Sequence, residues 1–179
     1  MRYSHRYRVK APQAAVADFH RRPLTLAGIT PPPIVVRLRR APRALVQGAD
    51  VEFTIWLGPL PVRWLARIEE SSPTGFVDRQ IDGPFRRWRH RHQFVPVDDA
   101  TTEVVDEVEA ALSCHPLWGP VGLAMWLGLP LVFAYRQRRT RDLLGRELAT
   151  AEALPCTPRQ GDGRADRMRR PPRQGASGE

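Results

Sequence analysis

A strict alternation of residue types between positions 88 and 94 constrains the fold of this chain more than any other feature. Successive side chains of a β-strand point to opposite faces. One face of the predicted strand carries aromatic residues and histidines: Trp88, His90, His92 and Phe94. The other face carries arginines and a glutamine: Arg87, Arg89, Arg91 and Gln93. The pattern predicts a strand with one buried and one solvent-facing side.

A second alternation follows between residues 101 and 112, after polar turn residues at Asp98 and Asp99. One face carries small, apolar and acidic side chains: Thr102, Val104, Asp106, Val108 and Ala110. The other is mostly acidic: Glu103, Val105, Glu107 and Glu109. If the two strands pair as an antiparallel hairpin, arginines face glutamates on the outside, each exposed pair contributing at most about 1 kcal/mol. The inner face then resembles the wall of a mixed cavity more than a plain apolar core.

Further strands are predicted before this hairpin, at residues 3–9, 34–40, 51–57, 62–68 and 76–81. Pro12 marks the start of a short helix, and prolines and Gly28 divide the following region into short helical pieces and a loop. The expected order is a strand, two short helices and a meander of six strands joined by tight turns. Such an antiparallel sheet needs a cover on one face.

The cover must come from the C-terminal part, where no charged residue lies between Leu117 and Tyr135. The length of this segment and the arginines after it would suit a membrane span. Its glycines and prolines disfavour one continuous helix. We therefore expect a loop at 116–120, a helical section and a main helix running to about Ala151. The expected sheet-facing stripe of that helix is Leu129, Val132, Phe133, Leu143 and Leu144.

Composition indicates one soluble domain at residues 1–152, followed by a disordered basic tail at 153–179, which is rich in Pro, Gly and Arg. The net charge of +9 comes from arginines spread along the chain. They are not interleaved with aromatic residues on one face, so no nucleic-acid partner is predicted. Cys114 and Cys156 lack metal-type spacing. The N-terminus has no apolar signal segment, which predicts a cytoplasmic protein.

Three segments, residues 76–94, 101–112 and 133–144, resemble the SRPBCC (START-like) superfamily, within it the bacterial group of cyclase/dehydrase-like ligand-binding proteins. The resemblance extends over about residues 3–149. It implies an α+β helix-grip fold: a curved antiparallel sheet of about seven strands around a long C-terminal helix, with two short helices after the first strand. It also implies a hydrophobic cavity between sheet and helix that takes bulky apolar molecules such as lipids, sterols or polyketides.

The inner face of the hairpin contains the candidate functional residues. A turn near Asp99 places His92 opposite Asp106, with His90 one pair further along. A carboxylate bonded to an imidazole fixes its tautomer and raises its basicity, as general acid–base chemistry requires. The same arrangement also suits a satisfied buried polar network or an anchor for a bound ligand. We commit to no catalytic residue, although His90, His92 and Asp106 are the candidates. The predicted ligand-binding residues are Phe76, Asp78, Gln80, Trp88, His90, His92, Phe94, Asp106 and Val108.

A zinc site of His90, His92 and Asp106 is permitted by the spacing but is not specified by it. The sequence therefore predicts no metal and no other cofactor. The predicted function is binding of a hydrophobic small molecule. One alternative is a polyketide cyclase- or dehydratase-type enzyme that uses the His/Asp cluster. The other is a membrane-associated protein anchored through residues 117–135, with peripheral membrane contact through residues 117–130.

Overall fold

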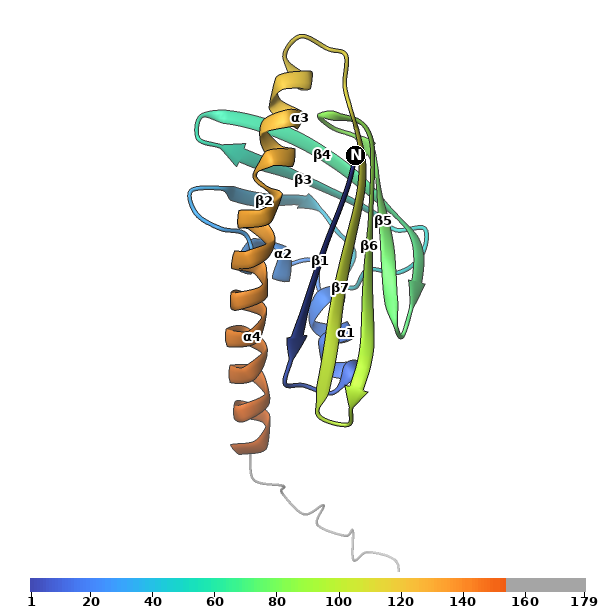
Figure 1. The fold of residues 1–179 in the computed structure, drawn as a ribbon, viewed down its shortest axis with the longest axis vertical. Helices are drawn as coiled ribbons and strands as arrows, with labels where there is room; N and C mark the ends of the chain where they lie inside the picture. Colours follow the sequence, from blue (N-terminus) through green and yellow to red (C-terminus); the bar gives the residue numbers. More distant parts are fainter. Residues whose placement is uncertain (154–179) are drawn as a thin grey trace, which may run out of the picture.

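The computed structural model describes residues 1–153, which fold as one antiparallel sheet covered by helices (Figure 1). The predicted tail, residues 154–179, lies outside the described residues. The elements along the chain are β1 (Arg2–Val9), α1 (Gln13–Arg21), α2 (Thr25–Gly28), β2 (Val35–Arg40), β3 (Asp50–Leu57), β4 (Leu60–Ser72), β5 (Gly75–Asp82), β6 (Phe85–Asp98), β7 (Thr101–Leu112), α3 (Trp118–Leu127) and α4 (Leu129–Ala153). The strand order is β1-β7-β6-β5-β4-β3-β2. The predicted α+β architecture is confirmed: a seven-stranded sheet, two short helices after the first strand and a long C-terminal helix.

The hairpin of β6 and β7 has the predicted register. His92 lies directly opposite Asp106, and His90 lies opposite Val108, one pair further along. The side chains that were expected to point inward are all buried. They are Thr102, Val104, Asp106, Val108 and Ala110 on β7, and Trp88, His90, His92 and Phe94 on β6. Period-two alternation therefore located the inward face correctly, because one buried face fixes the register of a strand.

The ion pairs on the outer face differ from the expected ones. Arg89 lies opposite Glu109 in the register. However, its side chain pairs with Glu69 and Glu70 of β4, at 3.2 and 3.1 Å. Glu109 pairs with Arg2 of β1 instead, at 3.2 Å. Long side chains reach diagonal neighbours as easily as direct ones, so a register does not determine the partner of an exposed arginine.

The C-terminal part forms two helices joined at Gly128. Our expected loop at 116–120 is wrong in part, because Pro120 lies in the first turn of α3 and Pro130 in the first turn of α4. The first amide groups of a helix have no intrahelical acceptor, so proline costs little there. His115 caps α3, since its Nδ1 accepts hydrogen bonds from the amides of Leu117 and Trp118, at 3.2 and 3.3 Å.

The apolar segment does not form one straight membrane-spanning helix. Among residues 1–153, no single helix is both long and apolar enough to cross a bilayer. Helices α3 and α4 taken together are long and apolar enough, but the pair is bent by 50° at its junction.

Two buried clusters hold the helices against the sheet. One forms around α1 and contains Val16, Phe19, Phe94, Val104 and Leu144. The other forms near the α3–α4 junction and contains Trp64, Phe85, Trp88, Leu129 and Phe133. Leu129, Phe133 and Leu144 come from the predicted stripe of α4, and all three are buried. The space between the two clusters contains the candidate site.

Candidate ligand-binding cavity

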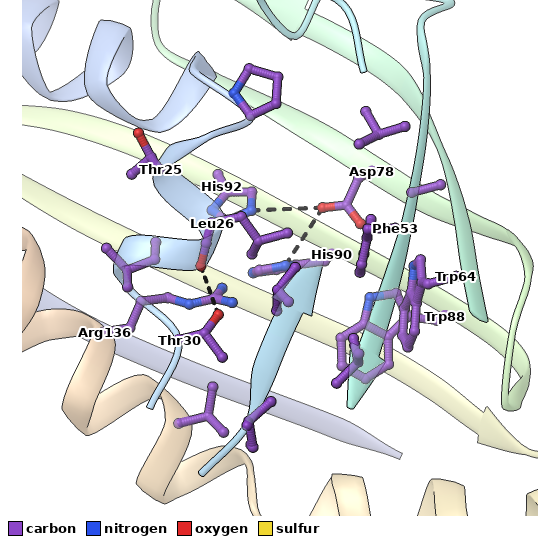
Figure 2. A pocket seen from close by; sticks show the side chains of 18 of the residues that line it. Thr25, Leu26, Thr30, Phe53, Trp64, Asp78, Trp88, His90, His92 and Arg136 are labelled. Carbon is purple, nitrogen blue, oxygen red and sulfur yellow. Dashed lines mark hydrogen bonds and ion pairs between the residues drawn. The ribbon is translucent and has the colours of Figure 1, made fainter. Parts of the chain in front are cut away.

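A cavity of about 360 Å³ lies between the sheet, α2 and the first turns of α4. Its volume falls within the range of small-molecule sites, about 300–1,000 Å³. Most of the wall is apolar: strands β3 and β4 contribute Val51, Phe53, Ile55, Trp64, Ala66 and Ile68, and α4 contributes Leu129, Val132 and Phe133. Trp64 and Trp88 pack edge to face, with ring centroids 5.3 Å apart. They close one end of the cavity (Figure 2).

A polar cluster interrupts the apolar wall. Asp78 on β5 and the two histidines of β6 line the cavity together (Figure 2). Strand pairing brings them together, because Asp78 lies opposite His90 and Phe76 lies opposite His92. The Asp78 Oδ2 atom lies 3.6 Å from His90 Nδ1 and 3.7 Å from His92 Nε2. The side chains of Asp78, His90 and His92 converge closely enough to hold one metal ion.

Asp106 supports both histidines from behind. Its Oδ1 atom lies 3.3 Å from His90 Nε2, which forms a hydrogen bond with it. The same oxygen lies 2.7 Å from His92 Nδ1, a close charge contact that is not aligned as a hydrogen bond. The side chain of Asp106 is only 2% exposed, and it does not belong to the cavity wall.

The cluster shifts the protonation of all three buried groups. Burial disfavours the charged form of Asp106, but the adjacent His92 and the hydrogen bond from His90 outweigh it and hold the Asp106 pKa well below its usual range. Burial also opposes protonation of His92, yet the Asp106 and Asp78 carboxylates together raise its pKa. Burial and the neighbouring His92 lower the pKa of His90. The two histidines therefore favour different protonation states.

Arg136 of α4 supplies a cation to the cavity wall. Its guanidinium carbon lies 5.1 Å from the centre of the Phe133 ring. Its Nε atom is buried without a hydrogen-bond partner, and Arg136 makes no ion pair with the described residues. Nearby, Thr30 donates its hydroxyl to the Leu26 carbonyl at 2.7 Å. Figure 2 shows Arg136 reaching toward Leu26 and Thr30, on the histidine side of the cavity and away from the two tryptophans.

The structure brings some of the predicted ligand-binding residues to the cavity and places others elsewhere. Five line it: Phe76, Asp78, Trp88, His90 and His92. Four do not: Gln80, Phe94, Asp106 and Val108. Gln80 donates to the Phe85 carbonyl at 2.7 Å and so closes the β5–β6 turn. Phe94 is covered by α1, with its ring centre 5.1 Å from that of His20.

Sequence reasoning missed much of the wall. Leu26 and Ile29, near α2, belong to it because a short helix folds over the sheet, an arrangement that no periodicity indicates. Arg136 had a signal, since it interrupts the apolar stripe of α4. His20 also lines the cavity. Burial lowers the pKa of this residue to about 4, so a neutral imidazole faces the cavity.

Comparison with known proteins gives similarity of structure without close similarity of sequence. No protein-family model matches the chain, and no curated protein matches it significantly. The Zhui aromatase/cyclase from Streptomyces sp. R1128 is 15% identical, with a TM-score of 0.68 over 86% of this chain and 99% of that one. Norcoclaurine synthase from Thalictrum flavum is 13% identical, with a TM-score of 0.62 over 83% and 96%.

A third similar structure is the nucleoside-diphosphate sugar epimerase from Corynebacterium glutamicum. It is 26% identical, with a TM-score of 0.60 over 84% of this chain but only 30% of the epimerase chain. Together with the sheet, the short helices and the long α4, these similarities establish the fold. The chain has a helix-grip fold, as the aromatase/cyclase and norcoclaurine synthase structures do.

Proposed function

We propose that the protein binds a bulky apolar small molecule in the cavity between the sheet and α4. The observation that carries this proposal is the cavity itself, which is lined mainly by aliphatic and aromatic side chains and has few polar groups. Removing apolar surface from water favours binding by about 25 cal/mol per Å². A few well-placed polar groups then fix the orientation of the ligand.

The polar groups indicate an amphipathic ligand. Asp78, His90 and His92 form one anchor, and Arg136 forms a second. A guanidinium group without an anionic partner in a largely apolar wall binds a carboxylate, sulfonate or enolate favourably, since charged hydrogen bonds in such surroundings contribute about 1.5–3 kcal/mol. The ligand we propose therefore has an apolar body and an acidic or strongly polarised oxygen.

Adjacent residues of α4 provide a matched test of the cavity. Val132 lines the cavity, whereas Leu131 is 78% exposed. We expect Val132→Trp to fill the space and to weaken binding of the apolar dye N-phenyl-1-naphthylamine at least tenfold. Leu131→Trp adds the same side chain at the surface and should leave the affinity within twofold. Fluorescence titration of the untagged full-length protein measures both, and thermal unfolding shows that each variant is folded.

Native mass spectrometry of the freshly purified protein complements this titration. An additional mass that disappears on denaturation, and that is absent from Val132→Trp, would support the proposal and identify the class of ligand. Equal dye affinity in the wild type and in Val132→Trp would refute ligand binding in this cavity.

A cyclase- or dehydratase-type enzyme is a second proposal, supported by the carboxylate behind each histidine. Contact with Asp106 makes the ring edge of His92 that faces the cavity more basic. Such a group could remove a proton next to a ligand carbonyl while Arg136 stabilises the developing oxyanion. Turnover of a polyketone substrate that is lost in His92→Gln, while dye affinity is kept, would support this activity. Equal turnover in the variant would exclude it.

A further inference from the structure

Three potential metal-ligand atoms converge on the cavity side of the polar cluster. Asp78 Oδ2, His90 Nδ1 and His92 Nε2 all lie within 4.8 Å of one another. The carboxylate oxygen is 3.6 Å from the first nitrogen and 3.7 Å from the second. Ligands held about 2.0–2.2 Å from a tetrahedral zinc ion lie about 3.4 Å apart. The two Asp78 contacts are close to this spacing, and the two histidine nitrogens lie no more than 4.8 Å apart.

None of these three atoms has a hydrogen-bond partner within the described residues. Both contacts to Asp78 exceed hydrogen-bonding distance, although the histidine side chains are only 7% and 9% exposed. All three residues line the cavity, so these atoms border its interior and are not enclosed in the packed core. Because the three atoms lie within 4.8 Å of one another, one cation on the cavity side could contact them together.

Asp106 holds the opposite edges of both rings. It contacts His90 Nε2 and His92 Nδ1, which are the nitrogens that face away from Asp78. A histidine bound to a metal usually donates its other N–H to a carboxylate, which fixes the tautomer and orients the ring. With a proton on each of these nitrogens, both lone pairs on the cavity side are free for a metal. Asp106 thus has the position expected of the residue that supports metal-binding histidines.

The charge of the cluster fits a divalent ion. Two carboxylates, those of Asp78 and Asp106, flank the two imidazoles on opposite edges. A bound cation compensates for negative charge that is shielded from water.

We propose that Asp78, His90 and His92 bind one divalent transition-metal ion of the zinc class, with Asp106 as the residue that positions both histidines. Two nitrogens and one oxygen are typical ligands for such an ion, and a site with three protein ligands leaves a position open. That position faces the cavity. The zinc site that the sequence permits has Asp106 as its third ligand. In the structure Asp78 takes that place, because strand β5 brings it to the side of the histidines that faces the cavity.

Zinc alone is the probe, so the outcome does not depend on the identity of an apolar ligand. The experiment uses the untagged full-length protein with Cys114→Ser and Cys156→Ser, treated with EDTA and freed of the chelator. Calorimetric titration should show one equivalent of Zn²⁺. Asp78→Asn should weaken the affinity at least tenfold, and Asp106→Asn by about 10–100-fold. Asp99→Asn changes an exposed acid in the β6–β7 turn and should have no effect.

Two spectroscopic measurements on the protein with its site intact keep the test valid if a variant fails to fold. Co²⁺ should give the intense visible absorption of four-coordinate cobalt, and Zn²⁺ should displace it. The ¹⁵N signals of His90 Nδ1 and His92 Nε2 should shift on addition of zinc, while those of His115 stay unchanged. Absence of zinc binding would overturn the proposal. So would zinc binding that leaves the ¹⁵N signals of His90 and His92 unchanged.

Discussion

The Oδ1 atom of Asp106 lies 2.7 Å from the Nδ1 atom of His92, and the two residues face each other across adjacent strands. The same oxygen also contacts His90 at 3.3 Å. One carboxylate therefore fixes two neighbouring imidazoles of β6, and their other edges line the cavity. Removing the charge of Asp106 should affect both rings at once.

We predict that Asp106→Asn destabilises the fold by about 3 kcal/mol. Loss of one member of a buried charged pair leaves the other without compensation, at a typical cost of 3–5 kcal/mol, and the amide oxygen of asparagine recovers part of this. Urea unfolding monitored by tryptophan fluorescence measures the change. Glu107→Gln, on the outer face of the same strand, should change the free energy of unfolding by less than about 0.5 kcal/mol. Equal effects of the two substitutions would show that the Asp106 contacts contribute no stability.

A second prediction concerns Arg136 and the charge of the ligand. Arg136→Met should weaken binding of the anionic dye 1-anilinonaphthalene-8-sulfonate about tenfold, because the sulfonate loses its cationic partner. Binding of neutral N-phenyl-1-naphthylamine should stay within twofold, since the apolar wall is unchanged. Arg138→Met removes an exposed arginine two residues away and should alter neither affinity.

The comparison of the two dyes isolates the contribution of the charge. If Arg136→Met weakens both dyes equally, the side chain acts through its volume. If it weakens neither, the acidic group that we propose for the ligand has no basis.

The sequence predicted the sheet and half of the site for a physical reason. Alternation reports which face of a strand is buried, and turn residues fix the register, so the pairing of His92 with Asp106 followed from local patterns. The same logic could not separate the cavity wall from the solid core. Phe76 and Phe94 both point inward, but α1 covers Phe94 and leaves Phe76 at the cavity.

The rest of the site depends on contacts between distant segments. Asp78 joins the histidines because β5 pairs with β6, and its closeness to both rings is set by side-chain rotamers. Arg136 lines the cavity because α4 packs across the sheet. The predicted cytoplasmic location and the absence of a nucleic-acid partner stay predictions.

A third prediction tests the close approach of β5 and β6. Gly75 begins β5, and a Cβ atom there would overlap the backbone carbonyl oxygen of His92. We expect Gly75→Ala to cost more than about 2 kcal/mol, because the two backbones must separate beside the polar cluster. Gly145→Ala is the matched substitution on α4. Its Cβ atom would meet no atom within 4 Å, so it should stabilise the helix by about 0.5–1 kcal/mol. Thermal unfolding compares the two variants, and the same sign for both would contradict the expectation.

The last prediction concerns acid stability and His20. Burial lowers the pKa of this imidazole from its ordinary value of 6.5 to about 4. Below pH 6.5 the unfolded chain takes up a proton at His20 that the folded protein does not accept until about pH 4. This contribution to stability is therefore complete above pH 6.5 and is lost as the pH falls toward 4, by about 3 kcal/mol in all.

Several titratable or charged groups surround His20, and those that titrate in this pH range add their own pH dependence to the stability. Tyr7 lies 3.5 Å away on β1, and His92, Asp106 and Arg136 act on His20 from β6, β7 and α4. The test is accordingly a difference between proteins: urea unfolding of the wild type and of His20→Gln at intervals from pH 7.5 to 4.5. The variant should lose roughly 2–3 kcal/mol less over this range than the wild type does. Parallel curves for the wild type and His20→Gln would mean that His20 is protonated as readily in the folded protein as in the unfolded chain.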